Sequence, residues 1–218
     1  MTILIQFAKP FELGHVKTRI ARTLGDEKAL TVHKQLCKSV NGQLNAWLVS
    51  ANSPFDKHNS QLWLSTPQTT FEREELNEQF CSAGLVYDRL ILQEGTDLGE
   101  RMTNAASLAL EQAASVVIVG SDFPVLDNAY LDQALAALAS HDAVLGPSED
   151  GGYGLIGFRS LTNLSLLGLD WGTNAALMQT VARAHEAGLA YHLLPARFDV
   201  DLEADYQRWQ SSRWYQRD

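Results

Sequence analysis

Four short segments of the chain combine charged residues and glycines in patterns suited to a phosphorylated ligand and a cation. The first lies at residues 7–19, directly after a strand-like run. Glycine lets its backbone turn closely, while lysine, threonine and arginine side chains donate hydrogen bonds to phosphate oxygens. It is not a Walker A loop, because Val16 stands where that pattern needs a glycine. A solvated basic loop is the alternative. The candidate phosphate-binding residues are Lys9, Gly14, Lys17, Thr18 and Arg19.

The second segment, residues 93–101, allows two interpretations. Asp97 and Glu100 have the spacing of a capping box, so the segment could serve only to start a helix. Alternatively, its glycines admit a nucleobase or ribose close to the backbone. The candidate nucleotide-binding residues here are Gln93, Gly95, Asp97 and Gly99.

Acidic residues mark the third and fourth segments. Asp122 follows the nearly all β-branched run Val116–Gly120, and a carboxylate at the end of a buried strand is a good ligand for Mg²⁺. Asp122 could also merely cap the next helix. Asp199 and Asp201 form a D-x-D triplet, whose side chains point to the same side of an extended chain.

The fourth segment also includes residues 146–153. Paired acids followed by two glycines make a loop that can approach a ligand closely. Turn-forming acids are common, so this pattern is informative only together with the other three segments. The candidate substrate-binding residues are Glu149, Asp150, Gly151, Gly152 and Tyr153.

Apolar runs and periodicities predict strands that alternate with helices. Such alternation predicts one α/β domain over residues 1–218, with a mostly parallel mixed sheet covered on both faces. Ligands bind beyond the carboxyl ends of strands in such sheets, where the four segments fall. A polar turn is expected around Asn52–Asn59. The predicted strands are Thr2–Phe7, Trp47–Ser50, Gln61–Ser65, Leu85–Leu92, Val116–Gly120, Ala143–Leu145, Tyr153–Phe158 and Ala190–Leu194. The predicted helices are Asp26–Ala46, Thr70–Phe80, Asp97 to about Ala114, Asn128–Ser140, Thr173–Ala187 (ended by Gly188) and one starting near Glu203.

The composition narrows the class of protein. The formal net charge is −9, so a nucleic-acid backbone would be repelled. No apolar stretch reaches the roughly 20 residues of a membrane span, and the N-terminus lacks the pattern of a signal peptide. Cys37 and Cys81 have no metal-ligand spacing, which excludes zinc and iron–sulfur sites and suits a reducing compartment. We expect a cytoplasmic protein with no nucleic-acid partner and no membrane span.

The charges are also unevenly distributed. Residues 1–25 hold four basic side chains and one acidic one, whereas residues 120–205 hold twelve acidic side chains and three arginines. This asymmetry fits a site whose basic edge binds phosphates and whose acidic edge binds a metal ion. Chance clustering of surface charges is the alternative.

The ordered motifs resemble a known bacterial family over nearly the whole chain. It is the family of radical-SAM/selenodomain-associated transferases, also labelled arsenosugar-biosynthesis glycosyltransferases. The resemblance implies the nucleotide-diphospho-sugar transferase (GT-A, Rossmann-like) fold, a three-layer α/β/α architecture. More distant relatives with this fold are 2-phospho-L-lactate and molybdenum-cofactor guanylyltransferases. The motifs are Phe7-Ala-Lys…Gly14-x-Val-Lys-Thr-Arg19, Asp97-Leu-Gly-Glu-Arg-Met102, Gly120-Ser-Asp-x-Pro124, Gly146-Pro-x-Glu-Asp-Gly-Gly-Tyr153, Trp171-Gly-Thr173 and Asp199-Val-Asp201.

The resemblance also implies residue roles. Asp122 matches the metal-binding aspartate of the fold, Asp201 matches a second metal ligand, and Lys17 and Arg19 match the phosphate-gripping loop. Trp171 and Thr173 join the candidate substrate-binding residues. The chain departs from the family pattern at Leu13, Gly154 and Leu202-Glu203, which puts the shape of the acceptor site in doubt.

Asp122 and Asp201 each follow a predicted strand, Val116–Gly120 and Ala190–Leu194. If these strands share one parallel sheet, the two carboxylates reach the same edge and can converge on one cation. Two clustered carboxylates repel each other without that cation. A separation above roughly 10 Å would exclude a shared site and would leave Asp199 or Asp150 as the second ligand.

The leading hypothesis is a glycosyltransferase that uses Mg²⁺ (or Mn²⁺), a nucleotide-diphospho-sugar donor and a small-molecule acceptor. Its catalytic residues would be Asp122, Lys17 and Arg19, which stabilise charge on the leaving diphosphate. One alternative is a guanylyltransferase-like nucleotidyltransferase, which joins a nucleoside triphosphate to a phosphorylated small molecule and releases pyrophosphate. Another is a nucleotide-binding protein without catalysis.

Overall fold

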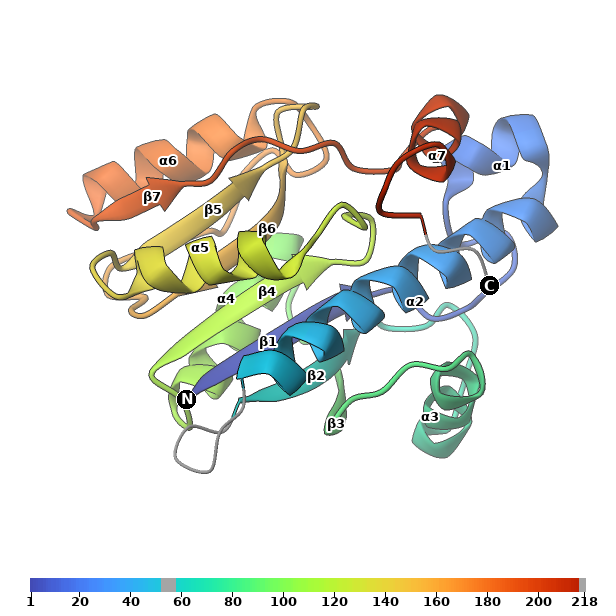
Figure 1. Ribbon diagram of the computed structural model, residues 1–218, viewed down its shortest axis with the longest axis horizontal. Coiled ribbons are helices and arrows are strands. Elements are labelled where there is room, and N and C mark those ends of the chain that lie inside the picture. Colours follow the sequence, from blue (N-terminus) through green and yellow to red (C-terminus); the bar gives the residue numbers. More distant parts are fainter. Residues whose placement is uncertain (52–57, 216–218) are drawn as a thin grey trace.

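The computed structural model describes residues 1–51 and 58–215, and within them the chain alternates strands and helices (Figure 1). The strands are β1 (Thr2–Ala8), β2 (Asn59–Leu64), β3 (Arg89–Leu92), β4 (Ser115–Gly120), β5 (Ala143–Pro147), β6 (Tyr153–Phe158) and β7 (Tyr191–Leu193). The helices are α1 (Thr18–Leu24), α2 (Asp26–Ala51), α3 (Arg73–Ser82), α4 (Leu98–Leu110), α5 (Asn128–Leu138), α6 (Ala176–Glu186) and α7 (Glu203–Gln210).

All of these strands belong to one sheet with the order β3-β2-β1-β4-β6-β5-β7. Neighbouring strands are parallel except at β6, which runs antiparallel to both β4 and β5. The prediction of a mostly parallel mixed sheet is confirmed.

Side chains that alternate along β1 separate the two faces of the sheet. Leu4 packs into a core with residues of α2 and α5, whereas Ile3 and Ile5 pack into a second core with residues of α4 and α6. Helix α3 closes the β2–β3 end together with Cys37 of α2. Helices therefore cover both faces (Figure 1), and the predicted three-layer α/β/α architecture is confirmed.

Two elements differ from the sequence prediction. Trp47–Ser50 is not a strand but the last part of α2, because Trp47 and Leu48 continue its buried apolar stripe. Helix α1 was not predicted, since seven residues are too few to show a periodicity. Strand β6 has the predicted bounds, and the other predicted strands and helices are present with shifted ends. Residues 52–57 of the predicted turn lie outside the described residues.

The carboxyl ends of the first four strands meet at one edge of the sheet. The segment after β7 crosses this edge on its way to α7 (Figure 1). It forms an isolated parallel bridge between Arg197 and Ser148, and Val200 N donates to Asp122 O at 2.9 Å. The C-terminal D-x-D triplet is thereby brought to the end of β4.

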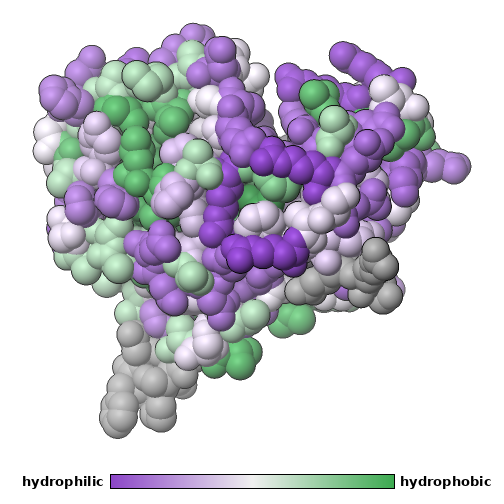
Figure 2. Space-filling model, turned by 45° about the horizontal axis from the view of Figure 1, so that its top comes forward, coloured by the Kyte–Doolittle hydropathy of each residue, from purple (hydrophilic) through white to green (hydrophobic). Residues whose placement is uncertain are grey.

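Among the described residues, no helix combines the length and the apolar character needed to cross a membrane. The surface seen in Figure 2 carries hydrophilic residues across its middle, with hydrophobic residues gathered to the left.

Candidate functional site

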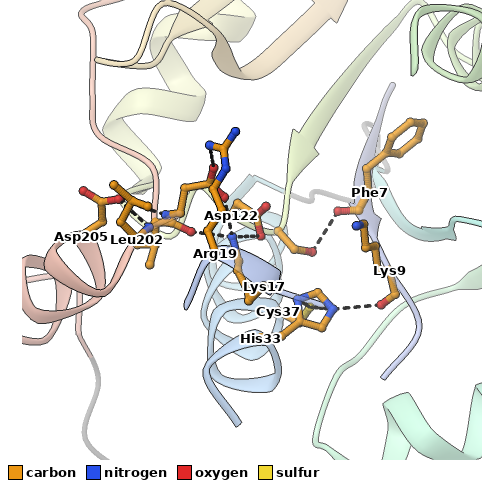
Figure 3. A network of polar contacts seen from close by, with 12 residues as sticks. Phe7, Lys9, Lys17, Arg19, His33, Cys37, Asp122, Leu202 and Asp205 are labelled. Atoms are coloured by element: carbon orange, nitrogen blue, oxygen red, sulfur yellow. Dashed lines mark hydrogen bonds and ion pairs between the residues drawn. The ribbon is translucent and has the colours of Figure 1, made fainter. Parts of the chain in front are cut away.

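Lys17 lies at the centre of the candidate site. It occupies the N-cap of α1 in a left-handed conformation, with φ of 46°, and its side chain is only 3% exposed. The ammonium Nζ lies 2.8 Å from Asp122 Oδ1 and 3.5 Å from Asp201 Oδ1, and it donates to Val200 O. Figure 3 shows Lys17 pointing toward Asp122. A left-handed residue is costly unless its surroundings hold it, and these three contacts do so.

Asp122 and Asp201 converge, as the sequence analysis expected. Both contact the same nitrogen, so their carboxylates lie well inside the limit of roughly 10 Å for a shared cation. The route differs from the expectation, because Asp201 arrives on the segment that follows β7 rather than at the end of a strand. The expected repulsion between the two carboxylates is offset by Lys17, which contacts both.

Charge around Asp122 keeps this carboxylate ionised. Burial opposes the charged form, but the ammonium of Lys17 outweighs it, and the pKa of Asp122 is lowered. Arg19, at the start of α1, adds an ion pair of 2.7 Å from its Nη1 to Asp201 Oδ2. The four residues place two cations and two carboxylates at the end of β4, with neutral His33 behind them.

His33 is a site residue that the sequence analysis missed. It lies on the buried face of α2, and its Nε2 is 3.0 Å from Lys9 O (Figure 3). Burial lowers its pKa, so the neutral ring contacts the backbone of the basic segment. The available signal was a polar residue between Ala29 and Cys37 on an otherwise apolar helical stripe.

Two cavities open at this edge of the sheet and share a wall. We call the first the basic cavity: it measures about 330 Å³ and includes four cationic side chains. We call the second the acidic cavity: it measures about 290 Å³ and includes four aspartates. Phe7, Arg19, Leu98, Gly120, Asp122 and Asp201 line both.

The predicted site residues divide between these cavities. Those that line the basic cavity are Lys9, Lys17, Thr18, Arg19, Gln93, Asp122 and Asp201. Those that line the acidic cavity are Arg19, Asp122, Asp150, Gly152, Tyr153, Trp171, Thr173 and Asp201. Those that line neither are Gly14, Gly95, Asp97, Gly99, Glu149 and Gly151.

The helix-cap interpretation explains Asp97. Its side chain accepts from Glu100 N at 2.8 Å and from Gly168 N at 3.0 Å, which lowers its pKa. Glu100 accepts from Thr96 N rather than from Asp97 N, so only half of the predicted capping box forms. Gly95 has a φ of 143°, and a Cβ there would crowd Arg101 N at 2.8 Å. Both residues shape the start of α4, and the geometry gives no support to nucleotide contact by either.

Other predicted residues also have structural roles. A Cβ at Gly99 would overlap Leu166 O, and one at Gly151 would come within 2.5 Å of Asn174 O. These glycines allow loops to pack closely, and they line neither cavity. Glu149 forms a two-pronged ion pair with Arg208 of α7, with distances of 2.6 and 3.0 Å.

Gly14 adopts a φ of 79°, and a Cβ there would stand 3.8 Å from Asp26. It therefore turns the basic segment toward α1 without lining a cavity.

Asp199 lines the acidic cavity and has an unusual environment. Burial, and next the charge of Asp150, raise its pKa to about 6. Asp150 is anchored differently: its Oδ1 accepts from Gly152 N at 2.9 Å and from the Ser148 hydroxyl. The remaining wall is aromatic, including Tyr153 and Trp171 in an edge-to-face contact at 6.1 Å.

The described residues contain no group of three or more histidine, cysteine or acidic side chains arranged to hold a metal ion. Asp122 and Asp201 supply two convergent carboxylates, and Mg²⁺ commonly uses one or two together with phosphate oxygens and water. The donor set therefore fits a magnesium ion that arrives with a phosphorylated ligand.

Arg101 and Ser121 are further residues of the basic cavity that the sequence analysis did not single out. Arg101 Nε donates to Gly95 O at 3.1 Å. Ser121 Oγ accepts from Gln6 Nε2 and donates to Phe7 O at 2.9 Å. Arg101 is the last residue of the 93–101 segment, so its position there was the available signal.

Solved structures of transferases resemble this chain. A Desulfovibrio desulfuricans G20 protein, provisionally named a nucleotide-diphospho-sugar transferase, is 27% identical, with a TM-score of 0.78 over 98% of this chain and 92% of its own. A nucleotidyl transferase from Methanothermobacter thermautotroptrophicus is 16% identical, with a TM-score of 0.59 and 95% of each chain covered. A CMP:2-keto-3-deoxy-manno-octonic acid synthetase complexed with CTP is 11% identical, with a TM-score of 0.58 and 95% of each chain covered. The last two likenesses concern the fold alone.

No curated protein matches the sequence. One family model matches residues 57–173, which is more than half of the chain. Its members are described as "Uncharacterized protein conserved in bacteria (DUF2064)". The chain belongs to this family, DUF2064.

Proposed function

We propose that this protein is a metal-dependent glycosyltransferase that takes a nucleotide-diphospho-sugar donor and a small-molecule acceptor. The observation that carries the proposal is the junction of a basic and an acidic cavity at Asp122 and Asp201. The Desulfovibrio desulfuricans G20 relative, which is 27% identical and bears the name of a nucleotide-diphospho-sugar transferase, supports the same function. We further propose, from the motifs described above, that the chain belongs to the radical-SAM-associated (arsenosugar-biosynthesis) branch of the family.

The basic cavity would hold the nucleotide and its diphosphate. Lys9, Lys17, Thr18 and Arg19 line it with donors, and hydrogen bonds between charged groups are the strong ones. Gln93 also lines the basic cavity and donates its Nε2 to Trp63 O at 2.9 Å, which fixes the orientation of its amide. These contacts would bind the leaving group and stabilise the charge that it gains.

Asp122 and Asp201 would hold Mg²⁺ or Mn²⁺ against the diphosphate. When bound, such an ion neutralises the negative charge that develops on the leaving oxygen. Lys17 now contacts both carboxylates, so it must give up part of this contact as the ion and the phosphates enter. The two carboxylates would therefore lie beside the Lys17 ammonium in the free protein and beside the metal ion in the ligand-bound protein.

A nucleotidyltransferase is the second candidate. The observation that favours it is the number of cations in the basic cavity, which suits a triphosphate as well as a diphosphate. Transferases of this type with the same fold also support it. A protein that binds nucleotide without turnover remains a third outcome of the test.

The test is to incubate the protein with nucleoside triphosphates and with nucleotide-diphospho-sugars in the presence of Mg²⁺. Release of nucleoside diphosphate supports glycosyl transfer, and release of pyrophosphate supports nucleotidyl transfer. Thermal shift runs beside the assay: we expect stabilisation by nucleotide and Mg²⁺ together that exceeds the effect of either alone. Nucleotide binding that ignores Mg²⁺ and gives neither product would support the third outcome.

We further propose that residues 1–218 form a single domain, since one sheet takes strands from both halves of the chain. The negative net charge and the two cysteines without metal-ligand spacing support a cytoplasmic protein with small-molecule partners and no nucleic acid.

A further inference from the structure

The acidic cavity carries an excess of negative charge at its lining. Four aspartates line it, and among the described lining residues Arg19 is the one basic side chain. Arg19 already pairs with Asp201 at 2.7 Å. The charge of this cavity therefore differs in sign from that of the basic cavity beside it.

The four aspartates are not equivalent. Asp122 and Asp201 contact Lys17, and a divalent cation could neutralise them further. Within the described part of the chain, Asp150 and Asp199 form no ion pair with a basic side chain. Asp150 and Asp199 both line the acidic cavity. Neither carboxylate therefore has a basic side chain among the described residues to neutralise it.

The rest of the lining is apolar and aromatic. Phe7, Phe123, Tyr153 and Trp171 contribute ring surfaces, and Met102 adds a flexible apolar side chain. Aromatic faces together with carboxylate acceptors suit an uncharged compound with hydroxyl or amine donors. A phosphomonoester, with a charge of about −1.5 to −2, would meet unpaired carboxylates instead of donors.

We propose that the acidic cavity excludes phosphorylated acceptors through Asp150 and Asp199, so that the acceptor is a hydroxyl or amine compound without a phosphate group. The inference rests on the proposed function and deepens it, because the nucleotidyltransferase alternative needs a phosphorylated acceptor. In the reaction, the acceptor oxygen or nitrogen bonds to the anomeric carbon of the donor sugar. The bond from that carbon to the diphosphate oxygen breaks, its electron pair leaves with the diphosphate, and the acceptor proton passes to water.

The experiment follows the indole N–H signal of Trp171 by NMR, since Trp171 lines the acidic cavity and not the basic one. The Trp171→Phe variant assigns the signal. Glycerol 3-phosphate and glucose 6-phosphate are the probes, with Mg²⁺ and whichever of UDP and GDP stabilises the protein more. The nucleotide occupies the basic cavity, so that a probe bound there does not obscure the result.

The variants are Asp150→Asn, Asp199→Asn and the two combined, which keep side-chain shape and remove charge. The control is Glu78→Gln with Glu186→Gln, an equal change of net charge at exposed helical positions outside both cavities. We expect no saturable shift with either probe for the wild type or the control. Saturable shifts should appear in the variants, and the double variant should bind the probes at least about tenfold more tightly than either single variant, because a like charge a few ångströms away is strongly repulsive below the dielectric of water.

Saturable probe binding by the wild type at Trp171 would overturn the proposal. So would equal behaviour of the wild type and the double variant, since exclusion would then not depend on these carboxylates. Failure of the proposed function has a different signature: neither UDP nor GDP would stabilise the protein, and the same titrations without nucleotide would still test exclusion.

Discussion

Replacing Lys17 by methionine tests the centre of the site. The change keeps most of the side-chain volume and removes the ammonium that contacts Asp122 at 2.8 Å and Asp201 at 3.5 Å. Breaking a fully buried ion pair costs about 3–5 kcal/mol, and an exposed pair contributes about 0.2–1 kcal/mol. Lys17 is 3% exposed, but its partners are 49% and 38% exposed, so we expect the free energy of unfolding to fall by about 2 kcal/mol.

Mg²⁺ should act differently on this variant and on the wild type. Without the ammonium, Asp122 and Asp201 repel each other, and a divalent cation can take its place between them. We therefore expect Mg²⁺ without nucleotide to stabilise Lys17→Met and to change the wild type little. Urea denaturation with and without Mg²⁺ measures both effects. Arg22→Met is the control, because it removes a charge from an exposed position of the same helix and should change stability by less than about 0.5 kcal/mol.

Nucleotide affinity gives a second readout of the same variant. Loss of a hydrogen bond to a charged group should weaken nucleotide binding by about 1.5–3 kcal/mol in calorimetry. Wild-type stability of Lys17→Met would show that the ammonium is not held as described. Equal stabilisation of both proteins by Mg²⁺ would refute competition between Lys17 and the metal, and unchanged nucleotide affinity would remove the basic segment from the site.

Two further predictions concern the frame of the site. Gly154→Ala should lower the unfolding free energy by about 1–3 kcal/mol in urea denaturation, because a Cβ there would overlap the Phe123 ring; wild-type stability would contradict this packing. Partial burial opposes ionisation of Asp127, but the Tyr130 N–H and Arg197 lower its pKa below the unfolded value of about 3.9. Its stabilising contribution is therefore present above that value and is lost as the pH falls through the folded pKa. The unfolding free energy of Asp127→Asn should accordingly fall less steeply with decreasing pH than that of the wild type. Equal slopes for the two proteins would contradict this role of Asp127.

Most of the sheet could be predicted from sequence because its strands are short, apolar and bounded by turn residues. The run Val116–Gly120 is almost entirely β-branched, and β4 occupies the same residues with one more at its start. The error at Trp47 has a physical cause: aromatic and β-branched residues favour strands locally, whereas here Trp47 and Leu48 extend the apolar stripe of a 26-residue helix and Val49 is exposed. Trp47 also donates its Nε1 to Asp132 on α5, a contact between residues far apart in the chain.

The candidate site could be predicted in part. Asp122 stood out because a charged residue at the end of a buried strand is informative in an α/β sheet, and Lys17, Arg19 and Asp201 stood out through the motifs that carry the family resemblance. The glycines were less informative. Gly99 and Gly151 allow loops to pack closely, and a glycine in that role looks the same in the sequence as a glycine that lies against a ligand. Sequence spacing alone cannot separate these two uses.

What the sequence could not provide is the partition of charge between two adjoining cavities. Lys17 and Asp201 are separated by 184 positions and meet because the segment after β7 crosses the edge of the sheet to Asp122. The same crossing leaves Asp150 and Asp199 on the far side of that junction, without a basic partner among the described residues. One short segment thus completes the cation-binding pair and also gives the neighbouring cavity its negative lining. The arrangement of charges that we connect with donor binding and with acceptor choice therefore depends on the long-range contacts of this one segment, and a substitution that displaces it should affect both.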